Sequence, residues 1–148
     1  MALHGITVLC RLSQSNLSYE ESVGRGAYIL HKEPHEKIDF VLIATGSEVW
    51  LALQVATALE KLGKSSRVIS MPCWELFDAQ PLPYRKEVLP RQGKRVSIEA
   101  ATSFGWHKWI GEDGIHISVD RFGASAPMSD LEQEYGFTVD SILDRLLS

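Results

Sequence analysis

Cysteine is scarce in this 148-residue sequence, and its two cysteines, Cys10 and Cys73, form no CxxC pair. A small secreted domain stapled by disulfides would contain more of them, so we expect a reduced, intracellular chain. Long apolar runs are also missing, because the longest ones have only the length of a strand. A membrane-spanning helix needs about 20 consecutive apolar residues, and we therefore expect no membrane partner.

An excess of basic residues is lacking as well. Lysine and arginine together number 15 against 19 aspartates and glutamates, which gives a formal net charge of -4. Nucleic-acid-binding proteins usually have a basic patch, so we expect no nucleic-acid partner. The sequence starts without the basic and long apolar regions of a signal peptide. Residues 6–10 instead look like a strand entered midway, which indicates a chain cut from something longer.

The most informative stretch runs from Phe40 to Leu62, where the apolar pattern changes period. Residues 40–44 are all apolar, which is typical of a strand buried on both faces. Thr45 and Glu48 fit a capping box at the start of a helix, and Gly63 fits its end. The helix is predicted from one apolar stripe at helical spacing, made of Val49, Leu53, Ala56, Leu59 and Leu62.

The rest of the chain adds strands and helices to this unit. Parallel strands are expected near residues 41, 68, 97 and 117. Residues 27–31 should form an antiparallel strand, because residues 32–39 are too few for a parallel crossover. Thr138 should cap a last helix with a stripe at Val139, Ile142, Leu143 and Leu146. Residues 12–22 are polar and are interpreted as a linker.

Strands alternate with helices in this order, which indicates an α/β fold. We predict three layers: a five-stranded mixed sheet, with four parallel strands and one antiparallel strand, and helices on both faces.

Two features at predicted strand ends are candidate sites. Thr45-Gly46-Ser47 lies at a strand-to-helix turn, where a helix N-terminus can bind a phosphate. Neither glycine-rich phosphate fingerprint is present, so a tight turn with a cap is the simpler interpretation. Glu99 ends a parallel strand, where α/β sheets often place ligands. It is either an acid or base, or a carboxylate bonded to neighbouring loop amides.

Other chemistry-bearing residues form no recognised pattern. The five histidines show no metal-ligand spacing such as HExxH, and no serine lies in a GxSxG elbow. The histidines are His4, His31, His35, His107 and His116. A set of aromatic residues in or beside loops fills the core or forms an interface, namely Trp74, Phe77, Trp106, Trp109 and Phe122.

Several multi-residue motifs occur in one order along the chain. They are FVLIATGSE (40–48), VISMPCWELFD (68–78), YRKEVLP (84–90), IEA (98–100), DRFGASAP (120–127) and YGFTV (135–139). Together they resemble the C-terminal domain of transketolase, of the kind found in bacteria and plastids. The resemblance covers about Gly24 to the end. Residues 6–11 resemble the final strand of the preceding pyrimidine-binding domain, so the expected domains are 1–22, with a linker, and 23–148.

The resemblance implies a transferase of the pentose phosphate pathway and Calvin cycle. Such an enzyme moves a two-carbon ketol unit from a ketose phosphate to an aldose phosphate, with thiamine diphosphate and Mg²⁺ or Ca²⁺ as cofactors. The implied partners are the remaining transketolase domains, a second subunit in a homodimer, and sugar phosphates. The implied location is the cytoplasm, or the plastid stroma in a plant.

The family's cofactor motif, Gly-Asp-Gly with a downstream asparagine, is missing from this chain, whose sole asparagine is Asn16. We therefore expect no catalytic, cofactor-binding or metal-binding residue here, and an inactive fragment when it is alone. Only Arg11 lines up with a functional residue of the family, the arginine that binds the substrate's phosphate. A guanidinium suits that task because its fork meets phosphate oxygens bidentately. Taken alone, Arg11 is equally a surface arginine beside a linker.

Two alternatives remain open from the sequence. In the first alternative, the chain is a stand-alone binding or docking module. In the second, it is the C-terminal domain of a related thiamine diphosphate enzyme, either a 2-oxoacid dehydrogenase or deoxyxylulose phosphate synthase. The motif at residues 120–127 favours transketolase over these relatives.

Overall fold

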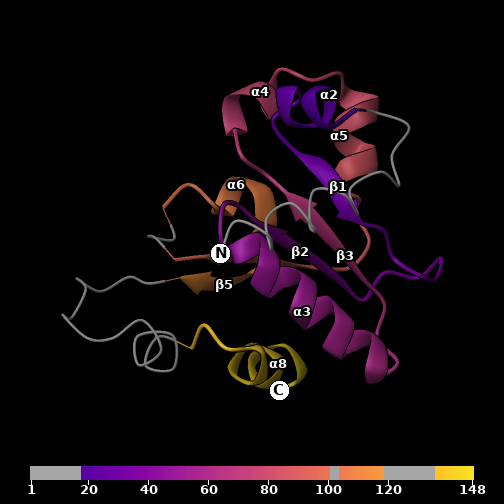
Figure 1. Cartoon of the computed structure of the whole chain (residues 1–148), viewed down its shortest axis with the longest axis vertical. Helices are drawn as coiled ribbons and strands as arrows, with labels where there is room; N and C mark the ends of the chain where they lie inside the picture. Colours follow the sequence, from indigo (N-terminus) through magenta and orange to yellow (C-terminus); the bar gives the residue numbers. More distant parts are fainter. Residues whose placement is uncertain (1–17, 101–103, 119–135) are drawn as a thin grey trace.

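A computed structural model describes residues 18–100, 104–118 and 136–148 of the chain. Its centre is a sheet of five strands in the order β1-β3-β2-β4-β5 (Figure 1). β1 runs antiparallel to β3, and all other neighbours are parallel. The predicted mixed sheet is therefore confirmed. The strands are β1 (Tyr28–His31), β2 (Phe40–Ala44), β3 (Ser66–Ser70), β4 (Lys94–Glu99) and β5 (Ile115–Ser118).

β2 lies at the centre of the sheet, between β3 and β4. All five of its residues are buried, as the unbroken apolar run predicts for a strand covered on both faces. The antiparallel direction predicted for residues 27–31 is confirmed. β1 does not pair with β2, its neighbour in sequence, but with β3 at the edge of the sheet.

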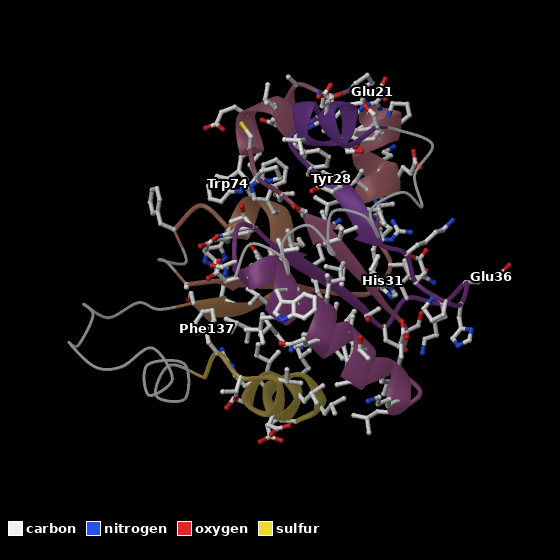
Figure 2. The ribbon with its side chains drawn as sticks, in the orientation of Figure 1. Glu21, Tyr28, His31, Glu36, Trp74 and Phe137 are labelled. Carbon is white, nitrogen blue, oxygen red and sulfur yellow. The ribbon has the colours of Figure 1, made fainter. Side chains whose placement is uncertain are left out.

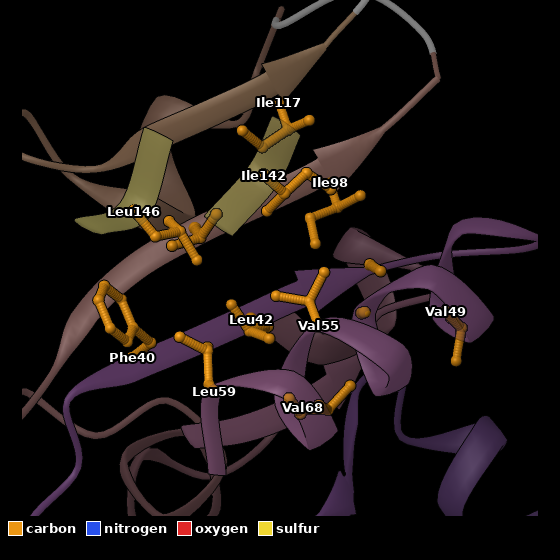
Figure 3. Packing of buried hydrophobic residues seen from close by; sticks show 14 of the residues in the cluster. Phe40, Leu42, Val49, Val55, Leu59, Val68, Ile98, Ile117, Ile142 and Leu146 are labelled. Atoms are coloured by element: carbon orange, nitrogen blue, oxygen red, sulfur yellow. The ribbon is translucent and has the colours of Figure 1, made fainter. Parts of the chain in front are cut away.

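Helices cover both faces of the sheet, which confirms the three layers. On one face, α3 and α8 pack on Leu42 and its neighbours, as Figure 3 shows for Val55, Leu59 and Ile142. On the other face, α4, α5 and α6 cover Val41 and Ile43. None of the helices in the described ranges is long and apolar enough to cross a membrane. The helices are α2 (Tyr19–Gly24), α3 (Glu48–Lys61), α4 (Trp74–Asp78), α5 (Leu82–Val88), α6 (His107–Ile110) and α8 (Val139–Leu147).

The predicted capping box of α3 is wrong. The N-cap residue is Ser47 rather than Thr45, and no side chain caps the helix, so Glu48 is the first helical residue. The predicted end is confirmed, because Gly63 takes the left-handed conformation with φ +72°. At α8 the predicted cap is confirmed: the Thr138 side chain accepts a hydrogen bond from the Ser141 amide.

Part of the predicted linker is helical. α2 begins within residues 12–22 and carries a complete capping box, in which Ser18 and Glu21 bond each other's backbone amides. Ser18-x-x-Glu21 is the sequence signature of such a start, and the linker interpretation overlooked it. Residues 1–17 lie outside the described residues, so the domain boundary near residue 22 stays a prediction.

Two arginines tie the helices of one face to the sheet: Arg67, which is buried, and Arg95, which is half-buried. Arg67 of β3 donates to the carbonyls of Glu87 and Val88 at the end of α5. Arg95 of β4 donates to the carbonyl of Pro90, which follows α5, and to the carbonyl of Trp109, which lies in α6. The last carbonyls of a helix lack partners within it, so these guanidinium groups satisfy acceptors that would otherwise be unpaired.

Candidate site at the carboxyl edge of the sheet

The carboxyl ends of β2 and β4 form the topological switch point of the sheet. After β2 the chain crosses to β3 through α3 on one face, whereas after β3 it crosses to β4 through α4 and α5 on the other. Doubly wound sheets bind ligands at such a point. Ala44 pairs with Ile98, so the structure brings both sequence candidates, Thr45-Gly46-Ser47 and Glu99, to neighbouring strand ends.

The turn after β2 places a carboxylate at the start of α3. Gly46 has φ +58°, a conformation that favours glycine. A Cβ there would meet nothing closer than Glu48 Oε2 at 3.8 Å, so the conformation rather than crowding requires glycine. The Ser47 hydroxyl donates to Glu48 Oε1 at 2.9 Å. The Glu48 carboxylate thus lies in the first turn of α3, where the helix dipole favours negative charge.

Among the described residues of this edge, the charges disfavour a phosphate. Burial, together with the nearby charge of Glu48, raises the pKa of Glu99 above its ordinary value. A phosphate at Thr45-Gly46-Ser47 would have to approach Glu48 in the first turn of α3 with Glu99 nearby. The tight-turn interpretation therefore fits the geometry better than a phosphate cradle.

Metal ligands do not gather at this edge or elsewhere in the described parts of the chain. Within residues 18–100, 104–118 and 136–148, no group of three or more His, Cys, Asp or Glu is placed to hold a metal ion. Glu99 lies at the end of β4, and burial together with the charge of Glu48 raises its pKa.

A serine and a histidine that sequence reasoning left apart lie side by side on β4 and β5. Ser97 pairs with His116 in the register, and its Oγ is 2.9 Å from His116 Nδ1. The His107 ring packs edge-on against His116 at 4.8 Å. Ser97 is 1% exposed, so no substrate reaches its hydroxyl. The pair therefore joins two strands, and only the strand register could have revealed it.

The aromatic residues expected in or beside loops belong mostly to helices. Trp74, labelled in Figure 2, and Phe77 lie in α4, and Trp109 lies in α6. Phe77, Trp106 and Trp109 are buried, and Trp74 contacts Trp106 edge-on at 5.1 Å. Phe122 and the predicted substrate-binding residue, Arg11, lie outside the described residues, as does the motif at 120–127. Other motif residues form secondary structure or the core. Residues 40–48 form β2, the turn after it and the start of α3, and Phe137 is a buried core residue.

These features define a three-layer α/β domain with a mixed sheet and an acidic switch point. The family model described as "Transketolase-like TK C-terminal domain" matches residues 26–138. The chain belongs to this family of transketolase C-terminal domains.

This chain is similar to one part of several transketolases, in sequence and in structure. Transketolase of Staphylococcus aureus (strain MW2) is 47% identical over 130 residues, which are 87% of this chain and 20% of the relative. Transketolase of Aquifex aeolicus (strain VF5) is 43% identical over 137 residues, or 92% of this chain and 20% of the relative. The structure of transketolase from Leishmania mexicana superposes with a TM-score of 0.76 at 44% identity, covering 89% of this chain and 19% of that one. The chain thus spans about one fifth of the length of these relatives.

Proposed function

We propose that this chain is the C-terminal portion of a transketolase and takes part in two-carbon ketol transfer between sugar phosphates only together with the rest of that enzyme. The observation that carries the proposal is the identity of 43–47% to transketolases over 87–92% of the chain. The same comparisons favour transketolase over the other thiamine diphosphate enzymes considered above.

The described residues do not fit thiamine diphosphate or its metal. The start of α3 is the natural anion site of this fold, but Glu48 places a carboxylate in its first turn. The described ranges also lack a cluster of metal ligands. We therefore assign the cofactor chemistry of the proposed enzyme to the four fifths of the relatives' length that this chain does not span.

Calorimetry of the 148-residue chain with thiamine diphosphate and Mg²⁺ tests whether this chain binds the cofactor by itself. No binding is expected. Binding tighter than about 10 μM, roughly −7 kcal/mol, would contradict it.

Arg11 is the residue of this chain for which we propose a direct role, the binding of the substrate's phosphate group in the complete enzyme. The support is its match to the family's phosphate-binding arginine and the bidentate geometry of a guanidinium. A charged hydrogen bond contributes about 1.5–3 kcal/mol, so Arg11→Ala should lower kcat/KM for a phosphorylated donor roughly 10- to 150-fold.

A donor without a phosphate is the control for Arg11→Ala, since it cannot make the contact. Its kcat/KM should change by no more than about threefold, because no interaction in the transition state is lost. An equal loss for both donors would show that Arg11 supports the fold or the cofactor site instead.

A further inference from the structure

Two histidines lie side by side where α6 meets β5. His107 begins α6 and His116 lies in β5, two elements that are neighbours in Figure 1. The centroids of their rings are 4.8 Å apart, and the ring planes are inclined at 73°. The turn between the two elements is tightly packed, because a Cβ added to Gly114 would lie 2.5 Å from Ile110 Cγ1. The backbones that carry the two rings are therefore held at a fixed spacing.

The neighbouring strand selects the nitrogen with which His116 can bind a metal ion. Ser97 Oγ lies 2.9 Å from His116 Nδ1. When Nδ1 carries the proton and donates to Ser97, the lone pair of the neutral ring is on Nε2. Histidines that bind metals ordinarily have such a partner on the other ring nitrogen, because it fixes the tautomer and the orientation of the ring. Ser97 is 1% exposed and pairs with His116 in the register, so it is well placed for that task.

The spacing of the rings fits one metal ion between them. Zn²⁺ binds imidazole nitrogens at about 2.0–2.1 Å with tetrahedral angles, so two rings on one ion have centroids roughly 5 Å apart. The observed 4.8 Å agrees with this value. His107 is exposed and His116 is half-buried, so His107 is the ring that can turn from its edge-on contact to direct a nitrogen at the ion. Coordination replaces whatever contact His116 Nε2 makes in the metal-free chain.

We propose that His107 and His116 form a two-histidine site for Zn²⁺. Imidazole is a ligand that zinc prefers, whereas Mg²⁺ and Ca²⁺ prefer oxygen ligands. The pair is smaller than the groups of three or more metal-binding side chains that the described ranges lack. Catalytic zinc sites have three protein ligands, so water completes the coordination here and the affinity is modest. The inference concerns this chain alone and does not rest on the proposed function.

Charges around the pair also limit the affinity. Arg145 of α8 donates to the His116 carbonyl at 2.8 Å, which brings a positive charge to the same strand. Lys108 follows His107, but its ammonium lies 2.6 Å from the Asp78 carboxylate, which offsets its charge. With two protein ligands and a guanidinium nearby, we expect a Kd of roughly 10–100 μM, far weaker than the binding of zinc to four-ligand structural sites.

Titration of the 148-residue chain with Zn²⁺, followed by NMR of the histidine side chains, tests the site. The ring signals of His107 and His116 should shift together and saturate with one Kd, and a chelator should reverse the change. His35 is exposed in the loop between β1 and β2; it is the internal comparison, and its signals should stay in place. Mg²⁺ at the same concentrations should shift neither ring of the pair, because it prefers oxygen ligands.

Single substitutions provide matched variants. His107→Asn changes an exposed side chain, so the chain should stay folded, but its affinity for Zn²⁺ should fall about tenfold or more because one of two protein ligands is lost. His116→Gln should weaken binding to the same degree. His35→Asn, an equally exposed change, should leave the Kd within about twofold of the original chain.

Any of four results would overturn the inference. The absence of a saturable shift below about 1 mM Zn²⁺ would show that the pair is no metal site. A shift of the His107 signals alone would show that the two rings share no ion. Equal affinity of the original chain and His107→Asn would make zinc an adventitious ion only, bound elsewhere. Binding that tightens as the protein concentration rises would assign the ion to a contact between two copies of the chain.

Discussion

Replacing Glu33 by Gln should destabilise the domain more than any change at a surface ion pair. Glu33 precedes β2 and pairs with Arg67 of β3; its Oε2 accepts from Arg67 Nε at 2.6 Å, and its Oε1 accepts from Arg67 Nη2. The two side chains are only 10% and 8% exposed. Glu33→Gln leaves a buried guanidinium without its counter-charge, a change that costs about 3–5 kcal/mol. For a domain of this size that is roughly 6–20 °C in Tm.

Urea denaturation of the 148-residue chain measures this effect, with two comparisons. The ion pair of Lys37 and Asp39, 2.9 Å apart, is the control, because its lysine is 80% exposed. Lys37→Met should cost no more than about 1 kcal/mol. Removing both charges, in Glu33→Gln with Arg67→Met, should cost less than Glu33→Gln alone, because no isolated buried charge remains. A single-variant cost below about 1 kcal/mol would refute the reasoning.

The ion pair of Glu33 and Arg67 should make the free energy of unfolding fall in acid. Burial opposes ionisation of Glu33, but hydrogen bonds and the charge of Arg67 outweigh burial and hold its pKa below 4.5. Because the pKa is depressed by folding, the stabilisation is present above pH 4.5 and is lost as pH falls through the folded pKa. The difference in stability between wild type and Glu33→Gln should therefore shrink below that pH.

Further predictions concern the helix starts and the acidic edge. Thr138→Ala removes the cap of α8 and should cost about 0.5–2 kcal/mol in urea denaturation, whereas Ser47→Ala at α3, which makes no capping bond, should cost less than about 0.5 kcal/mol; equal costs would contradict the assigned caps. Since burial and Glu48 raise the pKa of Glu99, its contribution to stability is present below pH 4.5 and is lost as pH rises through the folded value. Glu99→Gln should therefore stabilise the domain at neutral pH, and Glu48→Gln should lower the Glu99 pKa in a carboxyl NMR titration; an unchanged pKa would place the two carboxylates too far apart to interact.

The sequence predicted elements wherever a local pattern determines the structure. The apolar run of β2 and the left-handed Gly63 follow from neighbouring residues, and both have the predicted form. The cap at Thr138 was also correct. The cap at Thr45 was not, because the turn after β2 needs three residues, Thr45-Gly46-Ser47, before the helix starts. A capping motif identifies a helix start only if the preceding strand leaves room for it.

Features that depend on the arrangement of strands were not predictable from one sequence. β1 pairs with β3 because β2 occupies the centre of the sheet, and Ser97 meets His116 only through the register of β4 and β5. The switch point needed both the strand order and the face of each crossover. The separate patterns indicated Thr45-Gly46-Ser47 and Glu99 as candidates, but their closeness and the negative charge of the edge emerged from the fold.

Ketol transfer by a chimaera tests the central claim most directly. In this chimaera the chain replaces the matching segment, about one fifth of the length, of the Staphylococcus aureus transketolase. With thiamine diphosphate and Mg²⁺, a ketose phosphate donor and an aldose phosphate acceptor, the chimaera should transfer two-carbon units with kcat/KM within about tenfold of the parent Staphylococcus aureus enzyme, a difference of at most about 1.4 kcal/mol in transition-state stabilisation. The same protein without this chain should be inactive. A chimaera that folds and binds the cofactor but transfers no ketol unit would contradict the claim that this chain is the C-terminal portion of a transketolase.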